Sequence, residues 1–84
     1  MKISLVGFKN YVKDEEVIGV VFYGVECTEI HEGCGVRTFS EYIPSDKIFC
    51  SFSLGDILSI EFTQYRSRDG YRSYISAVRK EEDE

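Results

Sequence analysis

The sequence predicts one small all-β domain in which five antiparallel strands form a closed or half-closed barrel. Three observations lead to this fold class. The chain has 84 residues, which is enough for one domain with a thin core. Strand-favouring residues are abundant, and no long segment keeps the 3.6-residue apolar period of an amphipathic helix. Turn-forming residues separate the apolar segments at short intervals.

The first two strands are predicted from apolar, β-branched segments. The first is expected at Lys2–Phe8, with Tyr11–Val12 as an extension beyond a break. The acidic segment Lys13–Glu16 is expected to turn the chain. The second and longest strand is expected at Val17–Ile30. These two segments should form a hairpin.

Glycines mark the bends of the middle part of the chain. Gly19 and Gly24 lie inside the second strand and predict bulges or bends, which small barrels need. A loop is expected at His31–Gly35, because its glycines can adopt positive φ. The third strand, Val36–Ile43, follows and ends at the turn Pro44–Lys47, where the missing proline donor is tolerated.

The last two strands form the second predicted hairpin. Ile48–Phe52 is short and apolar, and its pattern fits either a strand or one helical turn. Ser53–Asp56 then leads into the fourth strand, Ile57–Tyr65, which has the cleanest two-residue alternation in the chain. Asp-Gly within the loop Arg66–Gly70 is a strong hairpin signal, so Tyr71–Arg79 is the fifth strand.

This strand pattern predicts an OB-like barrel over residues 1–80, and an SH3-like barrel with a similar strand count stays open as an alternative. Residues 81–84 are all acidic and are expected to form a C-terminal tail. The chain carries ten positive and fifteen negative side chains, a net charge of −5. Without the four tail acids the balance is 10 − 11 = −1, so the body is almost neutral.

The apolar segments are too short for targeting or membrane insertion. Met1–Phe8 is short for a secretory signal, and Val17–Val25 is about half of the length that a membrane helix needs. We therefore expect a soluble cytoplasmic protein.

Three cysteines and the single histidine raise the question of a metal site. Cys27, His31 and Cys34 lie close in sequence, and Cys50 follows sixteen residues later. Three thiolates and an imidazole can bind zinc, but the spacing matches no standard zinc motif. Isolated thiols in a reducing compartment are the favoured interpretation, so neither metal nor cofactor is expected and the zinc alternative stays open.

The segment Tyr65–Tyr74 is the strongest functional signal, because its ten residues include three arginines and three tyrosines. Single-stranded nucleic acid needs cations for its phosphates and flat faces for its unstacked bases. Arginine serves both needs. Arg37 and Phe39 repeat the theme on one face of the third strand, although Phe39 also fits a core position. The candidate nucleic-acid-binding residues are Arg37, Phe39, Tyr65, Arg66, Arg68, Tyr71, Arg72 and Tyr74.

The C-terminal half also resembles a known family. Val36–Lys47, Leu54–Phe62, Tyr65, a turn centred on Gly70 and Ile75–Arg79 occur in an order that resembles the small single-stranded-DNA-binding proteins of filamentous phages, the gene-five type, and their relatives on bacterial mobile elements. The resemblance implies an OB-like barrel and a two-fold dimer that coats single strands. It also implies that the nearest counterparts of the family's DNA-contacting positions contact DNA, namely Arg37, Phe39, Tyr65, Arg66, Arg68, Tyr71 and Arg72.

We therefore expect a non-enzymatic, sequence-tolerant protein that binds single-stranded DNA, with RNA as a second ligand of the same chemistry. The alternative is a protein-interaction module of a phage or mobile element that uses the same surface, since tyrosine and arginine also dominate protein interfaces. Nothing in the sequence places a nucleophile or carboxylate beside His31, so catalysis is not expected. A thin core and unpaired strand edges favour a homodimer.

Overall fold

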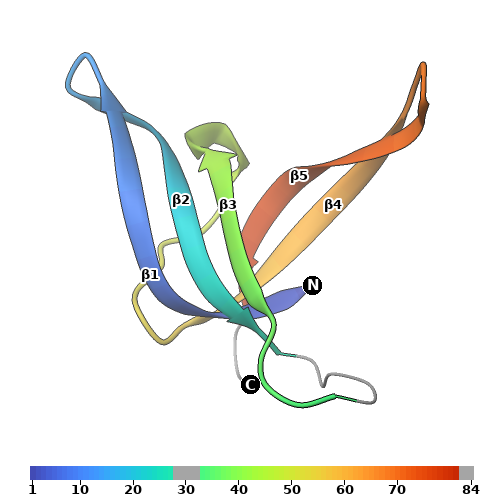
Figure 1. The fold of residues 1–84 in the computed structure, drawn as a ribbon. Helices are drawn as coiled ribbons and strands as arrows, with labels where there is room; N and C mark the ends of the chain where they lie inside the picture. The colour runs from blue at the N-terminus through green and yellow to red at the C-terminus, as the bar shows by residue number, and fades with distance from the viewer. Residues whose placement is uncertain (28–32, 82–84) are drawn as a thin grey trace.

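The computed structural model describes residues 1–27 and 33–81 and confirms the all-β class, with one five-stranded antiparallel sheet (Figure 1). Its order is β3-β2-β1-β4-β5, so β1 lies in the centre. Among the described residues, no helix is long and apolar enough to cross a membrane. The elements are β1 (Lys2–Lys13), β2 (Glu16–Glu26), β3 (Thr38–Pro44), the short 3-10 helix η1 (Ser45–Lys47), β4 (Ile57–Ser67) and β5 (Gly70–Lys80).

The sheet curls but does not close into a barrel. β3 and β5 stand at its two ends, and neither pairs with the other. The β1-β2-β3 part and the β4–β5 hairpin diverge like the arms of a V (Figure 1). A single parallel bridge between Ile48 and Val78 links the chain after η1 to β5. The radius of gyration is 14.2 Å, against about 12 Å for a compact chain of this length, so the molecule is extended.

The two arms are joined by a short ladder between the beginnings of β1 and β4. Lys2–Ser4 pairs with Ile57–Ser59 over only three residue pairs. The β1–β2 register then slips between Leu5 and Gly7, which leaves Val6 as a bulge. Because a bulge increases the local twist of a strand, β1 turns away from β4 at this point and continues as part of the other arm.

The core lies at the base of the V, where side chains from all five strands meet. Phe22 is fully buried, and its ring packs edge-to-face against Phe52 at a centroid distance of 4.7 Å. Each fully buried side chain of this size contributes roughly 1.5–3 kcal/mol of stability relative to an exposed one. The buried cluster consists of Ile3, Leu5, Val20, Phe22, Phe39, Ile43, Leu58, Ile60 and Val78.

The β1–β2 arm differs from its predicted boundaries. β1 runs without interruption through the predicted break at Lys9–Asn10 and reaches Lys13, because it pairs with β2 along its length. Asp14 and Glu15 form the turn, both with positive φ (52° and 66°). This backbone region costs non-glycine residues about 1–2 kcal/mol each, although it suits the twist of a two-residue hairpin. β2 ends at Glu26, and the rest of its predicted span lies beyond the described residues or at their edge.

The remaining boundaries shift by a few residues. β3 begins at Thr38 instead of Val36. Ile48–Phe52 is neither a strand nor a helical turn but an irregular segment, with Phe49 N donating to Val78 O at 3.0 Å. Glu81, predicted as the first residue of the tail, is tied to the sheet instead. Its backbone N donates to Ile57 O, and its carboxylate pairs with Lys2 at 2.9 Å.

Asp56 fixes the loop that enters β4. One carboxylate oxygen accepts hydrogen bonds from Ser53 N at 2.8 Å and Ser53 Oγ at 3.2 Å, and it lies 3.6 Å from Lys80 Nζ. The backbone hydrogen bond from Ser53 is the main reason why the pKa of Asp56 lies below its ordinary value, and Lys80 adds to the effect. The loop is thereby held beside β1, where Leu5 N donates to Asp56 O.

Gly24→Ala should destabilise the fold by about 1–3 kcal/mol, the usual cost of overpacking a core. A Cβ atom at Gly24 would lie 2.8 Å from Ile3 Cδ1 and 3.1 Å from Ser4 O, and Ile3 is fully buried. Gly7→Ala is the matched control, since its Cβ would approach no atom closer than 3.6 Å. Urea unfolding measures both. Equal midpoints for the two variants would contradict this packing argument.

Asp56→Asn should lower the urea midpoint at neutral pH, because an amide cannot replace the charged acceptor. The folded-state pKa of Asp56 is lowered, so its stabilising effect is present above its ordinary value of 3.8 and is lost as the pH falls through the lowered value. The difference between wild type and variant should therefore shrink below about pH 4. A difference independent of pH between about 2 and 7 would show that the carboxylate charge is not responsible.

Candidate nucleic-acid interface

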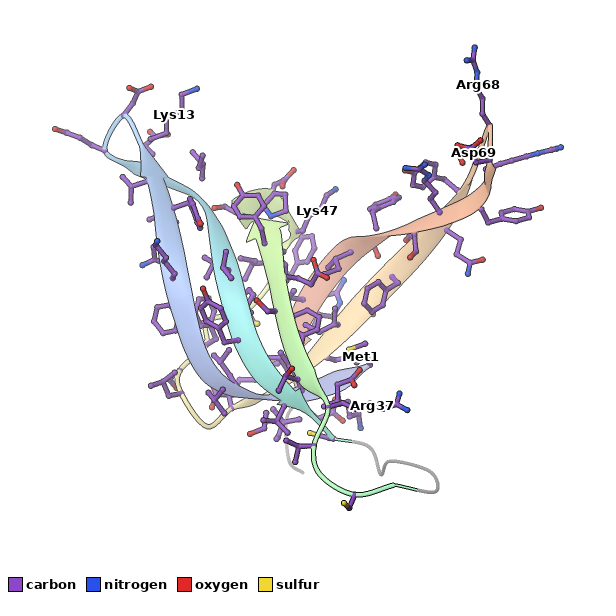
Figure 2. The ribbon with its side chains drawn as sticks, viewed as in Figure 1. Met1, Lys13, Arg37, Lys47, Arg68 and Asp69 are labelled. Atoms are coloured by element: carbon purple, nitrogen blue, oxygen red, sulfur yellow. The ribbon has the colours of Figure 1, made fainter. Side chains whose placement is uncertain are left out.

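The β4–β5 hairpin brings together most of the predicted site residues. Its distal part, from Tyr65 to Tyr74, is called the Arg–Tyr ribbon below. Arg68 stands at its tip, whereas Arg37 lies at the other end of the molecule (Figure 2). The predicted residues on the ribbon are Tyr65, Arg66, Arg68, Tyr71, Arg72 and Tyr74.

Cross-strand pairing divides the ribbon into two faces. Tyr65 pairs with Arg72, and Arg66 pairs with Tyr71. Because successive side chains of a strand point to opposite sides, these two Arg–Tyr pairs face opposite ways. The Arg66–Tyr71 pair lies on the face that continues the core side of the sheet, called the inner face here.

A β-bulge keeps the inner face in line with the core. Ile60 pairs with Val78, and two residues further along β4 Phe62 pairs with Ile75. The register shift between Glu61 and Phe62 leaves one extra residue in β5. Without this bulge, Ile75 would face the opposite side from Val78. The inner face therefore runs continuously from the core to the tip of the ribbon.

The arginines of the ribbon are available to a partner. Arg72 NH2 lies 3.6 Å from the Asp69 carboxylate, but both side chains are largely exposed, so this ion pair is weak. Arg66 and Arg68 have no ion pair with any residue among 1–27 and 33–81. Tyr71 is 76% exposed. On the outer face, Tyr65 and Tyr74 support each other, with ring centroids 5.8 Å apart.

Two of the predicted residues lie away from the ribbon. Phe39 is only 7% exposed and belongs to the buried cluster, so its predicted role as a stacking platform has to be corrected to that of a core residue. It pairs with Gly24 of β2. Arg37 is exposed but precedes β3, and the structure does not bring it near the other arginines (Figure 2).

A cleft separates the end of β3 from the lower part of the ribbon. Its volume is about 470 Å³, within the range of small-molecule sites. Lys47 projects from η1 towards the β4–β5 hairpin (Figure 2). The residues that line the cleft are Glu41, Tyr42, Pro44, Lys47, Phe62, Ser73, Tyr74 and Ile75.

The cleft exists because the sheet is open at this point. Glu41 pairs with the buried Phe22 and is two residues away from both Phe39 and Ile43, which are buried. Side chains two residues apart in a strand share a face, so Glu41 lies on the core side of β3. In a closed barrel β5 would cover this position. Here Glu41 is exposed, and Phe62 on the opposite wall is 44% exposed. The alternation of β4 places Phe62 on the same side as the buried Leu58 and Ile60, and no local signal showed that β3 and β5 stay apart.

The outer face of the other arm carries a separate aromatic group. The ring of Tyr42 covers Gly19, where a Cβ atom would meet the ring at 2.3–2.5 Å. Tyr11 packs edge-to-face on Tyr42 at 5.6 Å, and Lys9 Nζ lies 5.5 Å from the Tyr11 ring centroid. Gly19 thus provides space for a tyrosine, and the register shift next to its pair Tyr11 is the irregularity that its position predicted.

The described cysteines do not form a metal centre. Cys27 and Cys34 are exposed, whereas Cys50 is half-buried with its Sγ 3.8 Å from Val78 O. Burial, together with the nearby Asp56 charge, raises the pKa of the Cys50 thiol. Across residues 1–27 and 33–81, no three potential ligands converge. His31, the fourth predicted ligand, lies outside the described residues.

Comparisons with known proteins do not add a family. No family model, no curated protein and no solved structure matches this chain. The functional argument therefore depends on the geometry of the ribbon and the cleft.

Proposed function

We propose that this protein binds single-stranded DNA without catalysing a reaction, and that the inner face of the Arg–Tyr ribbon is its contact surface. The observation that carries the proposal is the exposed Arg66–Tyr71 pair, in which a cation and a flat aromatic face stand side by side on a projecting hairpin. A phosphate and its neighbouring base need this combination. The OB-like strand order supports the same ligand, as does the resemblance of the C-terminal half of the sequence to the gene-five type of protein.

The inner face is favoured over the outer face for two reasons. It leads directly into the cleft, so a strand bound at the tip can continue along Phe62 and Ile75. The outer face has its arginine next to Asp69, and its tyrosines pack on each other. A strand on the inner face therefore meets more unpaired polar groups and more free aromatic surface.

The net charge of −5 favours the alternative, a protein-interaction module that uses the same side chains. An acidic cluster lies far from the ribbon, however, and the ribbon itself contains one acid, Asp69. Asp14 and Glu15 lie at the tip of the other arm, beside Lys13 (Figure 2). The ribbon carries three arginines against one acid, so a polyanion there meets a locally basic surface. The binding experiment below distinguishes the two candidates, because only nucleic-acid binding by the ribbon depends steeply on salt.

Replacing the inner pair (Arg66→Ala with Tyr71→Ala) should weaken binding to a labelled oligo-dT strand about tenfold or more, from one lost phosphate contact and one lost stacking partner. The salt slope, log K against log salt, should fall in magnitude by about 0.7. The matched control is the outer pair (Tyr65→Ala with Arg72→Ala), which removes the same residue types. Fluorescence anisotropy at several salt concentrations measures both.

For the outer pair we expect a loss of about threefold at most. A larger loss for the outer pair than for the inner pair would place the strand on the opposite face. Absence of any salt-dependent binding by the folded wild-type protein would reject the nucleic-acid proposal in favour of the protein-interaction module. Oligo-U in place of oligo-dT tests whether RNA is bound as well.

We also propose that the protein self-associates through the distal part of the β1–β2 arm. Val12 and Val17 pair across the two strands, and both are exposed, as is Ile18 beside them. Large apolar side chains gathered on a projecting hairpin are typical of an interface, and a second copy of this chain would cover them symmetrically.

Val12→Asp should convert a dimer into a monomer, because the new carboxylate would have to enter the apolar contact. Val36→Asp is the matched control, an exposed valine outside the arm. Sedimentation velocity on wild type and both variants measures the change. A wild-type protein that is monomeric at high micromolar concentration would contradict the proposal, as would equal effects of the two substitutions.

A further inference from the structure

We propose that the cleft between β3 and the ribbon receives one base of the bound strand, and that Glu41 makes guanine the preferred base there. This inference rests on the proposed binding of single-stranded nucleic acid. The inference adds a base preference to that binding, because a surface made only of arginine and tyrosine does not distinguish bases.

Glu41 is the unusual residue of the cleft. It occupies a core-side position of β3 between the buried Phe39 and Ile43. Within the part of the chain that the structure describes, its carboxylate has no ion pair. Closing β3 onto β5 would remove this charge from water without a partner, which is strongly unfavourable. Glu41 therefore opposes closure, and its carboxylate stays directed at the cleft.

The opposite wall offers an apolar surface. Phe62 and Ile75 form a cross-strand pair on the inner face, with Ser73 next to them on β5. Lys47, half-buried, supplies an ammonium group at the β3 side. The cleft thus combines an aromatic wall, one carboxylate that accepts hydrogen bonds and one cation that donates them.

A nucleobase fits this combination, and guanine fits it best. The ring of a base can lie against Phe62, as unstacked bases do on aromatic side chains. Guanine carries two adjacent donors, N1–H and the N2 amino group, which match the two oxygens of a carboxylate. Adenine and cytosine offer one amino group each, as in the glutamate–cytosine contacts of other complexes. Thymine offers only N3–H between two carbonyl oxygens, which a carboxylate repels.

The position of the cleft connects it to the ribbon. From the tip, the inner face presents Arg66 and Tyr71, then Gln64 and Ser73, and then the Phe62 wall. A strand whose phosphate is held by Arg66 therefore runs towards the cleft, where Lys47 can meet a second phosphate or the O6 atom of guanine. The amine-bearing edge of the base then faces Glu41.

The test uses fluorescence anisotropy with a labelled short oligo-dT strand that carries one central substitution. Wild-type protein should bind the strand with a central dG about fivefold to tenfold more tightly than the all-T strand. Deoxyinosine at the same position lacks the N2 amino group, so most of this gain should disappear. This comparison changes the ligand alone and leaves the protein intact.

Glu41→Gln should reduce the dG preference to less than about twofold and should slightly tighten binding of the all-T strand, because a negative charge near the phosphates is removed. Glu16→Gln is the matched control. It removes the same charge at the start of β2, and the dG preference should persist. Thermal unfolding verifies that both variants are folded, as expected for exposed side chains.

The outcomes separate this inference from the proposed function. Salt-dependent binding of all strands with equal affinity, or a dG preference that survives Glu41→Gln, would overturn the role of Glu41 and leave the single-strand binding intact. No binding of any strand by folded protein would overturn both. Loss of the dG preference in Glu41→Gln but not in Glu16→Gln would support guanine recognition by the cleft.

Discussion

The short ladder between Lys2–Ser4 and Ile57–Ser59 is the constraint on which the rest of the structure depends. It joins a three-stranded arm to a two-stranded arm, and the core forms where the two meet. Backbone groups of Met1 and Ile60 extend this junction, with Ile60 N donating to Met1 O at 2.7 Å. Because β1 leaves β4 at the Val6 bulge, the arms diverge at once. Both hairpin tips, the cleft and the exposed aromatic surface follow from this early separation.

The openness of the sheet is supported by side-chain chemistry as well as by strand geometry. Glu41 places a charge where a closed barrel would need an apolar residue, and Phe62 faces it from the other arm. The irregular segment after η1 contacts β5 from Ile48 to Cys50, and the Phe49 ring also lies 5.0 Å from the Arg79 guanidinium. This segment therefore bridges the gap between β3 and β5 near the core, whereas the two strands stay apart farther towards the hairpin tips.

Local patterns predicted most of the elements, whereas non-local contacts decided the site. The alternation around Leu58 and Ile60 and the Asp-Gly turn are local signals, so the β4–β5 hairpin and its arginines could be found from sequence. Phe39 is buried because its side of β3 faces the core. The alternation of β3 alone fits either side, so the sequence left open whether Phe39 packs in the core or binds a base. The cleft depends on residues about twenty positions apart, Glu41 and Phe62, that face each other only because β3 and β5 do not pair. No periodicity within one strand contains that information.

The separation of charge between the two tips has a consequence for how the molecule meets its surroundings. The β1–β2 tip carries three acids and Lys13, whereas the β4–β5 tip carries three arginines and Asp69, so the two tips have opposite net charge. In the field of any charged body, a dipole experiences a torque before contact is made. A negatively charged surface therefore turns the β4–β5 tip towards itself, and a positively charged one turns the β1–β2 tip. The net charge of the chain describes neither approach, since the orientation depends on where the charges lie.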